Sequence, residues 1–152
     1  MLRLLPTALL LFLASGGSAQ TRTFLSPGIK FGYQWDVGMF AGLEISYTIM
    51  PNSPGFIYGA TFNLDLLRSG GYKVHLGVQG SSFIGGEIGP TYAKEWGKLA
   101  EWGYSASIYT LVGLMPYYTF TDLFGRKINE AGLLIKIPIQ LSGRELGSLF
   151  KT

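Results

Sequence analysis

Apolar and polar residues alternate along most of the chain from about residue 28 onward. One such segment runs from Gly38 to Ile49, where every odd position is apolar and the even positions hold Gly38, Phe40, Gly42, Glu44, Ser46 and Thr48. A period of two residues predicts a β-strand with two unlike faces. Seven other segments show the same alternation or a strand-like composition: residues 28–36, 56–66, 72–79, 83–92, 104–112, 116–121 and 129–139.

Turn signals separate these segments. Pro51-Asn52-Ser53-Pro54-Gly55 follows the second predicted strand, and Arg68-Ser69-Gly70-Gly71 follows the third. Prolines and glycines at this density interrupt strands and favour turns. Eight strands joined by short connections predict an all-β fold, an eight-stranded antiparallel up-and-down β-barrel.

Alternation alone does not say which face of the barrel meets water. A soluble barrel encloses its apolar face, whereas a transmembrane barrel presents that face to lipid and encloses its polar face. None of the eight predicted segments carries Asp, Glu, Lys, Arg or His on its apolar face. Because each Lys or Arg there would cost about 2–4 kcal/mol at the bilayer midplane, this pattern favours a transmembrane barrel.

Glycines on the polar face favour the same orientation: Gly32, Gly38, Gly42, Gly59, Gly77, Gly85, Gly89 and Gly132. Glycine weakens a strand exposed to water, but it makes room for larger side chains in a narrow lumen. The polar residues expected to form a network inside the lumen are Lys30, Glu44, Asp65, Lys73, His75, Glu87, Glu130 and Lys136. Their charges have both signs, so they can pair across the barrel.

Aromatic residues on the apolar face gather toward the strand ends. The residues expected to form a girdle at the two membrane interfaces are Trp35, Tyr47, Tyr58, Tyr72, Tyr92, Tyr104 and Tyr118. Amphipathic rings are enriched at these levels of transmembrane barrels. The alternative is that aromatic residues simply favour strands.

With this architecture the chain resembles the small outer-membrane β-barrels of Gram-negative bacteria, the eight-stranded OmpX-type class, over about residues 24–139. The resemblance implies outer-membrane lipid and the outer-membrane assembly machinery as partners. We also expect a monomer. One departure from the class is that its barrels usually end in a strand with a terminal aromatic residue, whereas here the last predicted strand ends near Ile139 and a tail follows.

The N-terminal residues predict that the protein is exported. Arg3, the apolar run of residues 4–13 and the small residues 14–19 have the features of a secretory signal. We therefore expect a signal peptide at residues 1–19, the barrel at residues 20–139, and localisation to the outer membrane. In the tail, residues 140–152, Ser142 and Glu145 have the spacing of a capping box, which predicts either a short amphipathic helix or a frayed end.

Charge and cysteine content exclude other classes. The chain has 12 Lys and Arg residues against 9 Asp and Glu residues, a formal charge of +3, and the basic residues are scattered. Such a distribution does not indicate nucleic-acid binding. Because there is no cysteine, stability cannot depend on disulfides.

Candidate chemistry is sparse. The single histidine, His75, would need a nucleophile and an orienting acid to act as a base, or companion ligands to bind a metal. Outer-membrane lipid hydrolases carry a His-x-Ser motif on a similar barrel, whereas His75 is followed by Leu76 and Gly77. We therefore predict a non-enzymatic protein without a cofactor or metal, with an outer-membrane lipid-modifying enzyme as an alternative.

One loop could bind a partner. Residues 94–103 repeat Glu-Trp-Gly, and Trp96 and Trp102 could form a surface-binding site. The simpler interpretation places both rings at the outer membrane interface.

The leading hypothesis is an integral outer-membrane barrel of porin-like architecture, with a side-chain-filled lumen and a structural or surface-interaction role. The main alternative is a secreted soluble barrel that holds a hydrophobic ligand among Phe31, Leu43, Phe62, Leu76 and Ile135.

Overall fold

The computed structural model describes residues 21–35, 37–51, 56–110 and 114–141. This part of the chain forms the strands β1 Arg22–Gln34, β2 Gly38–Met50, β3 Ile57–Leu67, β4 Gly71–Ser81, β5 Ile84–Glu95, β6 Glu101–Thr110, β7 Leu114–Asp122, β8 Lys127–Lys136 and β9 Ile139–Leu141. Each of the eight predicted segments corresponds to one of the first eight strands, several of which extend beyond the predicted bounds. The predicted signal peptide at residues 1–19 and the predicted helix after Ser142 lie outside the described residues.

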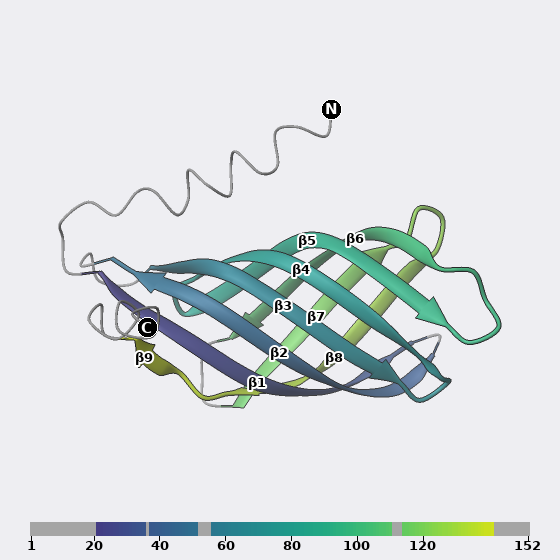
Figure 1. The fold of residues 1–152 in the computed structure, drawn as a ribbon, viewed down its shortest axis with the longest axis horizontal. Coiled ribbons are helices and arrows are strands. Elements are labelled where there is room, and N and C mark those ends of the chain that lie inside the picture. Colours follow the sequence, from purple (N-terminus) through teal and green to yellow (C-terminus); the bar gives the residue numbers. More distant parts are fainter. Residues whose placement is uncertain (1–20, 36, 52–55, 111–113, 142–152) are drawn as a thin grey trace, which may run out of the picture.

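Strands β1 to β8 form a closed antiparallel barrel (Figure 1). Each strand pairs with its neighbours in sequence, and β1 pairs with both β2 and β8, so the cylinder closes. The predicted eight-stranded up-and-down topology is therefore confirmed. Closure gives every long strand two partners, which removes exposed sheet edges.

The last predicted strand is interrupted at Ile137 and Pro138. β8 ends at Lys136, and β9 then pairs with the first residues of β1, from Thr23 to Leu25. The Ile137 backbone nitrogen donates to the Pro27 carbonyl oxygen at 3.0 Å, but Pro138 has no N–H to continue the ladder. β9 extends the barrel wall to Leu141, two residues beyond the predicted boundary.

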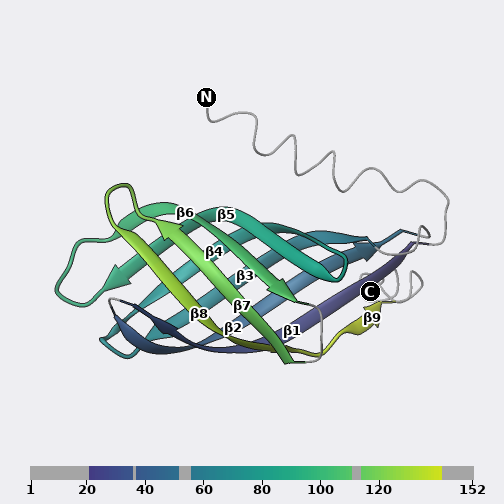
Figure 2. The ribbon, with the colours of Figure 1, turned by 180° about the vertical axis from the view of Figure 1, so that it is seen from behind.

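The two ends of the barrel differ. At the terminal end, on the left in Figure 1, β1 begins and β9 ends. At the distal end four turns join the strands: residues 35–37, 68–70, 96–100 and 123–126. Figure 2 shows the same arrangement from behind, with β7 and β8 in front. Because the distal turns have only three to five residues, the barrel presents little loop surface at this end.

Side chains alternate between the outside and the lumen in the predicted orientation. Leu43 and Leu76 are 57% and 54% exposed, whereas Glu44 is 3% exposed. The soluble alternative is wrong on this point, because the residues proposed to enclose its ligand all point outward and are exposed: Phe31, Leu43, Phe62, Leu76 and Ile135.

The charged residues on the outer face of the described strands lie at the distal end of the barrel. Among the described strand residues, the outward positions carry a charge at Lys94, Asp122 and Lys127, all at the distal ends of their strands. These residues lie beyond the predicted segments, whose outward positions are free of charge. The outer wall is therefore an apolar band bounded by charge at the distal end.

The described residues include no helix long and apolar enough to cross a membrane.

Candidate functional site

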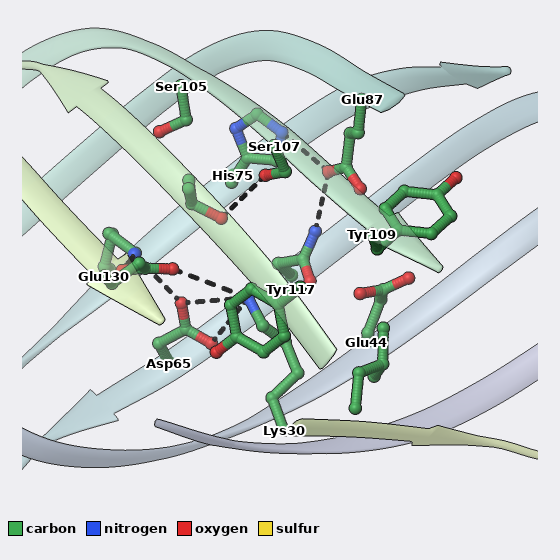
Figure 3. A pocket seen from close by; sticks show the side chains of 14 residues that line it. Lys30, Glu44, Asp65, His75, Glu87, Ser105, Ser107, Tyr109, Tyr117 and Glu130 are labelled. Carbon is green, nitrogen blue, oxygen red and sulfur yellow. Dashed lines mark hydrogen bonds and ion pairs between the residues drawn. The ribbon is translucent and has the colours of Figure 1, made fainter. Parts of the chain in front are cut away.

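The lumen is the candidate site, and its centre holds four charged side chains from opposite walls: Lys30 on β1, Asp65 on β3, Lys73 on β4 and Glu130 on β8. Figure 3 labels Lys30, Asp65 and Glu130 of these. Lys30 Nζ lies 3.4 Å from Asp65 Oδ1 and 4.0 Å from Glu130 Oε1. Lys73 Nζ lies 3.2 Å from Asp65 Oδ2 and forms a second ion pair with Glu130. All four side chains are buried. Because two positive and two negative charges cancel, the cluster avoids the large penalty of an unpaired buried charge.

Aromatic rings cover this central cluster. Lys30 Nζ lies 5.0 Å from the ring centroid of Tyr117 and 5.9 Å from that of Phe40. Lys73 Nζ lies 5.5 Å from the Phe40 centroid. At these distances the lysines gain cation–π attraction. Glycine provides the space, because a Cβ on Gly32 would lie 2.7 Å from Phe40 Cζ.

A second cluster is built around His75. Its Nε2 lies 2.7 Å from Glu87 Oε1, which also accepts a hydrogen bond from Asn63 Nδ2 at 3.0 Å. Gly77 makes room for this pair, since a Cβ there would lie 2.7 Å from His75 Nε2 and from Glu87 Cγ. On its other side, His75 Nδ1 lies 2.9 Å from Thr91 Oγ1.

Hydroxyl groups extend the hydrogen bonds of His75 and Thr91 into a chain that crosses to neighbouring strands of the barrel. Thr91 Oγ1 and Ser105 Oγ are 2.6 Å apart, and Ser105 Oγ and Thr121 Oγ1 are 2.7 Å apart. A hydroxyl both donates and accepts. These hydrogen bonds therefore satisfy buried polar groups on four successive strands, β4, β5, β6 and β7.

The order acid, imidazole and hydroxyl in Glu87, His75 and Thr91 is that of a nucleophilic triad. The surroundings do not suit this chemistry. Thr91 is 1% exposed, and the free space among the central side chains is about 20 Å³. Since a water molecule needs about 10–15 Å³ of such space, the centre has room for one water and not for an acyl substrate.

A third ion pair lies nearer the terminal end. Lys136 on β8 pairs with Glu44 on β2, and its Nζ lies 3.5 Å from Ser46 Oγ. Lys136 Nζ also lies 5.6 Å from the ring centroid of Tyr109, whose hydroxyl donates to Gln79 Oε1 at 3.0 Å.

The distal end is closed by a small apolar cluster and an ionic clamp. Ala93, Leu123 and Ile128 pack together and are buried. Arg126, on the turn between β7 and β8, binds Glu95 at 2.5 Å and Glu101 at 2.7 Å, while Lys98 Nζ binds Glu95 at 2.6 Å. The clamp ties the β7–β8 turn to the ends of β5 and β6.

All eight residues predicted for the lumen network point into the lumen, where they form three separate groups. Lys30, Asp65, Lys73 and Glu130 form the central cluster, His75 and Glu87 the second, and Glu44 and Lys136 the third.

Four of the seven predicted girdle residues lie near the distal end, namely Trp35, Tyr72, Tyr92 and Tyr104, whereas Tyr118 lies at the middle of β7. Trp35 contacts Tyr118 at 6.1 Å between ring centroids, and Tyr72 contacts Tyr92 at 6.0 Å. The other two, Tyr47 and Tyr58, lie toward the terminal end. Outward aromatic residues are therefore concentrated toward the distal end. We call Trp35, Tyr72, Tyr92, Trp102 and Tyr104, with Tyr118 in contact with Trp35, the distal aromatic group.

The two tryptophans of the predicted binding loop lie in different surroundings. The Trp102 ring packs on Tyr92 with centroids 4.9 Å apart, as part of the distal aromatic group. Trp96 lies on the β5–β6 turn over Gly70, where a Cβ would approach its ring to 3.0 Å. The two rings therefore have different neighbours, Tyr92 for Trp102 and the β3–β4 turn for Trp96.

Several lumen residues were not identified from the sequence. The hydroxyl chain needs Thr91, Ser105 and Thr121, and the distal clamp needs Glu95 and Arg126. Thr91 and Ser105 fall on the inward side of the two-residue alternation, which was a usable signal. Serine and threonine are too common in strands, however, for these two residues to be singled out.

No protein-family model matches the chain, and no curated protein matches it. Within the described part, no group of three or more His, Asp or Glu side chains is placed to hold a metal ion.

Proposed function

We propose that the protein is an integral outer-membrane β-barrel with a non-enzymatic, structural role. The observation that carries this proposal is the apolar outer wall combined with a charged, paired lumen. Exposed apolar surface this extensive is costly in water, and it is the surface that a transmembrane barrel presents to lipid.

Strand length supports the proposal. Strands β1 to β8 have 9 to 13 residues, and a tilted strand of about 9–11 residues crosses the hydrocarbon core. The distal aromatic group and the nearby charges of Lys94, Asp122 and Lys127 would then mark one interface.

The lumen supports a structural role over transport or catalysis. The central ion pairs leave about 20 Å³ of free space, and the distal clamp closes one end. Solutes larger than water would not pass, and the buried Thr91 hydroxyl could not reach a lipid. The distal turns are the surface left for outside contacts, with Trp96, Leu99 and Phe124 exposed on them.

Carbonate extraction of fractionated cells tests the proposal. We expect the protein in the membrane pellet after extraction at high pH, and we expect its migration on a detergent gel to change when the sample is heated. Recovery in the soluble fraction, with migration independent of heating, would rule out the membrane barrel.

A further inference from the structure

A cavity of about 380 Å³ opens at the terminal end of the barrel, and we call it the vestibule. Its apolar lining comes from Phe24, Met50, Ile57, Met115 and Pro138. Its polar lining includes Ser46, Gln79, Tyr109 and Lys136. Most of the exposed lining surface is apolar, although polar residues are as frequent as apolar ones around it. A cavity of this size with an apolar surface and convergent polar groups has the composition of a small-molecule site.

The vestibule ends blindly at Tyr109. This residue lines both the vestibule and the small central space, so its ring separates the two. Gly85 allows this position, because a Cβ there would lie 2.2 Å from the Tyr109 ring. Since the central cluster and the distal clamp fill the lumen beyond, a ligand would enter and leave on the side of the chain termini.

Polar groups of the vestibule offer hydrogen-bond donors. Gln79 Oε1 accepts from the Tyr109 hydroxyl at 3.0 Å, which leaves the two N–H groups of the amide as donors. Among the described residues that line the vestibule, Lys136 alone is charged, and its partner Glu44 lines the central space instead. A ligand head that accepts hydrogen bonds and carries a negative charge fits these groups.

The size of the cavity suits a medium-chain ligand. At the roughly 30 Å³ that a water molecule occupies in the liquid, a volume of about 380 Å³ has room for at least a dozen non-hydrogen atoms. A saturated ten-carbon carboxylate has this many.

We propose that the vestibule binds a medium-chain fatty acid. The carboxylate lies beside Lys136 and Gln79, and the alkyl chain contacts Phe24, Met50, Ile57 and Met115. The vestibule belongs to the barrel itself, so the proposal does not depend on the surrounding lipid.

Methionine methyl groups provide a direct test. Beyond the predicted signal peptide the chain has Met39, Met50 and Met115. Met50 and Met115 line the vestibule, whereas Met39 is exposed on the outer wall. The protein is labelled with ¹³C-methyl methionine, held in lipid nanodiscs and titrated with decanoate, or titrated in buffer if it proves soluble.

We expect saturable shifts of the Met50 and Met115 methyl signals, with Met39 unchanged. Equal shifts of all three would show partition into lipid, and absence of shifts would show absence of binding. Either result overturns the proposal. Decanoyl lysophosphatidylcholine, with its larger headgroup, should leave both signals in place, and binding as tight as that of decanoate would overturn the assignment to a free carboxylate.

Substitutions locate the site. Lys136→Gln should weaken decanoate binding about tenfold and leave decanol binding unchanged, whereas the matched control Lys127→Gln, on the outer wall, should change neither. Because Lys136→Gln leaves Glu44 unpaired and could impair folding, Thr48→Trp provides a second variant. Thr48 lines the vestibule, so a tryptophan there should abolish binding of both ligands.

Persistent binding to Thr48→Trp would overturn the proposal.

The chain's own tail is the competing occupant. If a chain ending at Leu141 binds decanoate and the full chain does not, the tail fills the vestibule and the fatty acid is excluded.

Discussion

Lys73 and Glu130 form an ion pair between β4 and β8, two strands that lie halfway around the eight-stranded barrel from each other. Both side chains are buried, so removal of one leaves an uncompensated charge in the lumen. We expect Lys73→Met or Glu130→Gln alone to lower the free energy of unfolding by about 3–5 kcal/mol. Urea unfolding in lipid vesicles measures this change.

The double variant distinguishes pairing from packing. If the two residues interact, Lys73→Met with Glu130→Gln should destabilise the barrel by less than the sum of the single changes. Lys127→Met, at an exposed outward position, is the control and should change the free energy of unfolding by less than about 0.5 kcal/mol. Additive single effects would contradict a direct interaction between Lys73 and Glu130.

The space that glycines leave for other side chains in the lumen gives a second prediction. A Cβ on Gly42 would lie 2.1 Å from Asp65 Oδ1, whereas a Cβ on Gly86, which points outward, would meet its nearest atom at 3.5 Å. We expect Gly42→Ala to destabilise the barrel by about 1–3 kcal/mol, because overpacking displaces Asp65 from Lys30. Gly86→Ala should be neutral or stabilise it by up to about 1 kcal/mol. Equal effects of the two substitutions would contradict a packed lumen.

The alternation of residues was enough to predict the strands, the barrel and the inward direction of Glu44. Side-chain direction follows from a period of two alone, so the eight lumen residues could be placed on one face. Their partners could not be predicted, because which residues meet across a barrel depends on the stagger between strands. Nothing local in the sequence pairs Lys73 with Glu130 rather than with Glu44.

Other features were missed because their residue types are uninformative. Alternation places Phe40, Tyr109 and Leu134 on the inward face, but it does not show that they pack together as part of an apolar cluster in the lumen. The interruption after β8 was signalled by Pro138, but the strong alternation around it predicted an unbroken strand. The distal clamp depends on Arg126, which lies in a turn where strand periodicity gives no direction.

Charge on the outer wall gives a third prediction. Leu43 and Leu133 lie on the outer wall within β2 and β8, away from the strand ends. If this wall contacts lipid, we expect Leu43→Arg or Leu133→Arg to reduce stability in vesicles by about 2–4 kcal/mol. Asn129→Arg, an outward change near the distal end of β8, should cost at most about 1 kcal/mol. Equal tolerance at all three positions would place the wall in water.

The distal clamp gives a fourth prediction. Arg126 joins Glu95 to Glu101 and is partly exposed, so we expect Arg126→Ala to lower overall stability by only about 1 kcal/mol. Hydrogen exchange should be more sensitive. The amides of Leu123 and Trp96, in the turns on either side of the clamp, should lose protection, and those in the middle of β2 should not. Arg68→Ala, on the exposed β3–β4 turn, is the control and should leave the amides of both turns protected.

The tryptophans give the last prediction, which concerns depth in the membrane. Trp35 and Trp102 pack among the outward aromatic rings of the distal group, whereas Trp96 lies on a turn beyond the strands and is 78% exposed. In variants that keep one tryptophan each, with the others replaced by phenylalanine, we expect brominated lipids to quench the fluorescence of Trp35 and Trp102. Iodide in the water should quench Trp96 more strongly, because rings of a barrel girdle lie at headgroup level while the turn extends into solvent. If all three tryptophans are quenched equally by iodide and not by brominated lipid, the distal aromatic group lies in water and the proposed membrane interface is wrong.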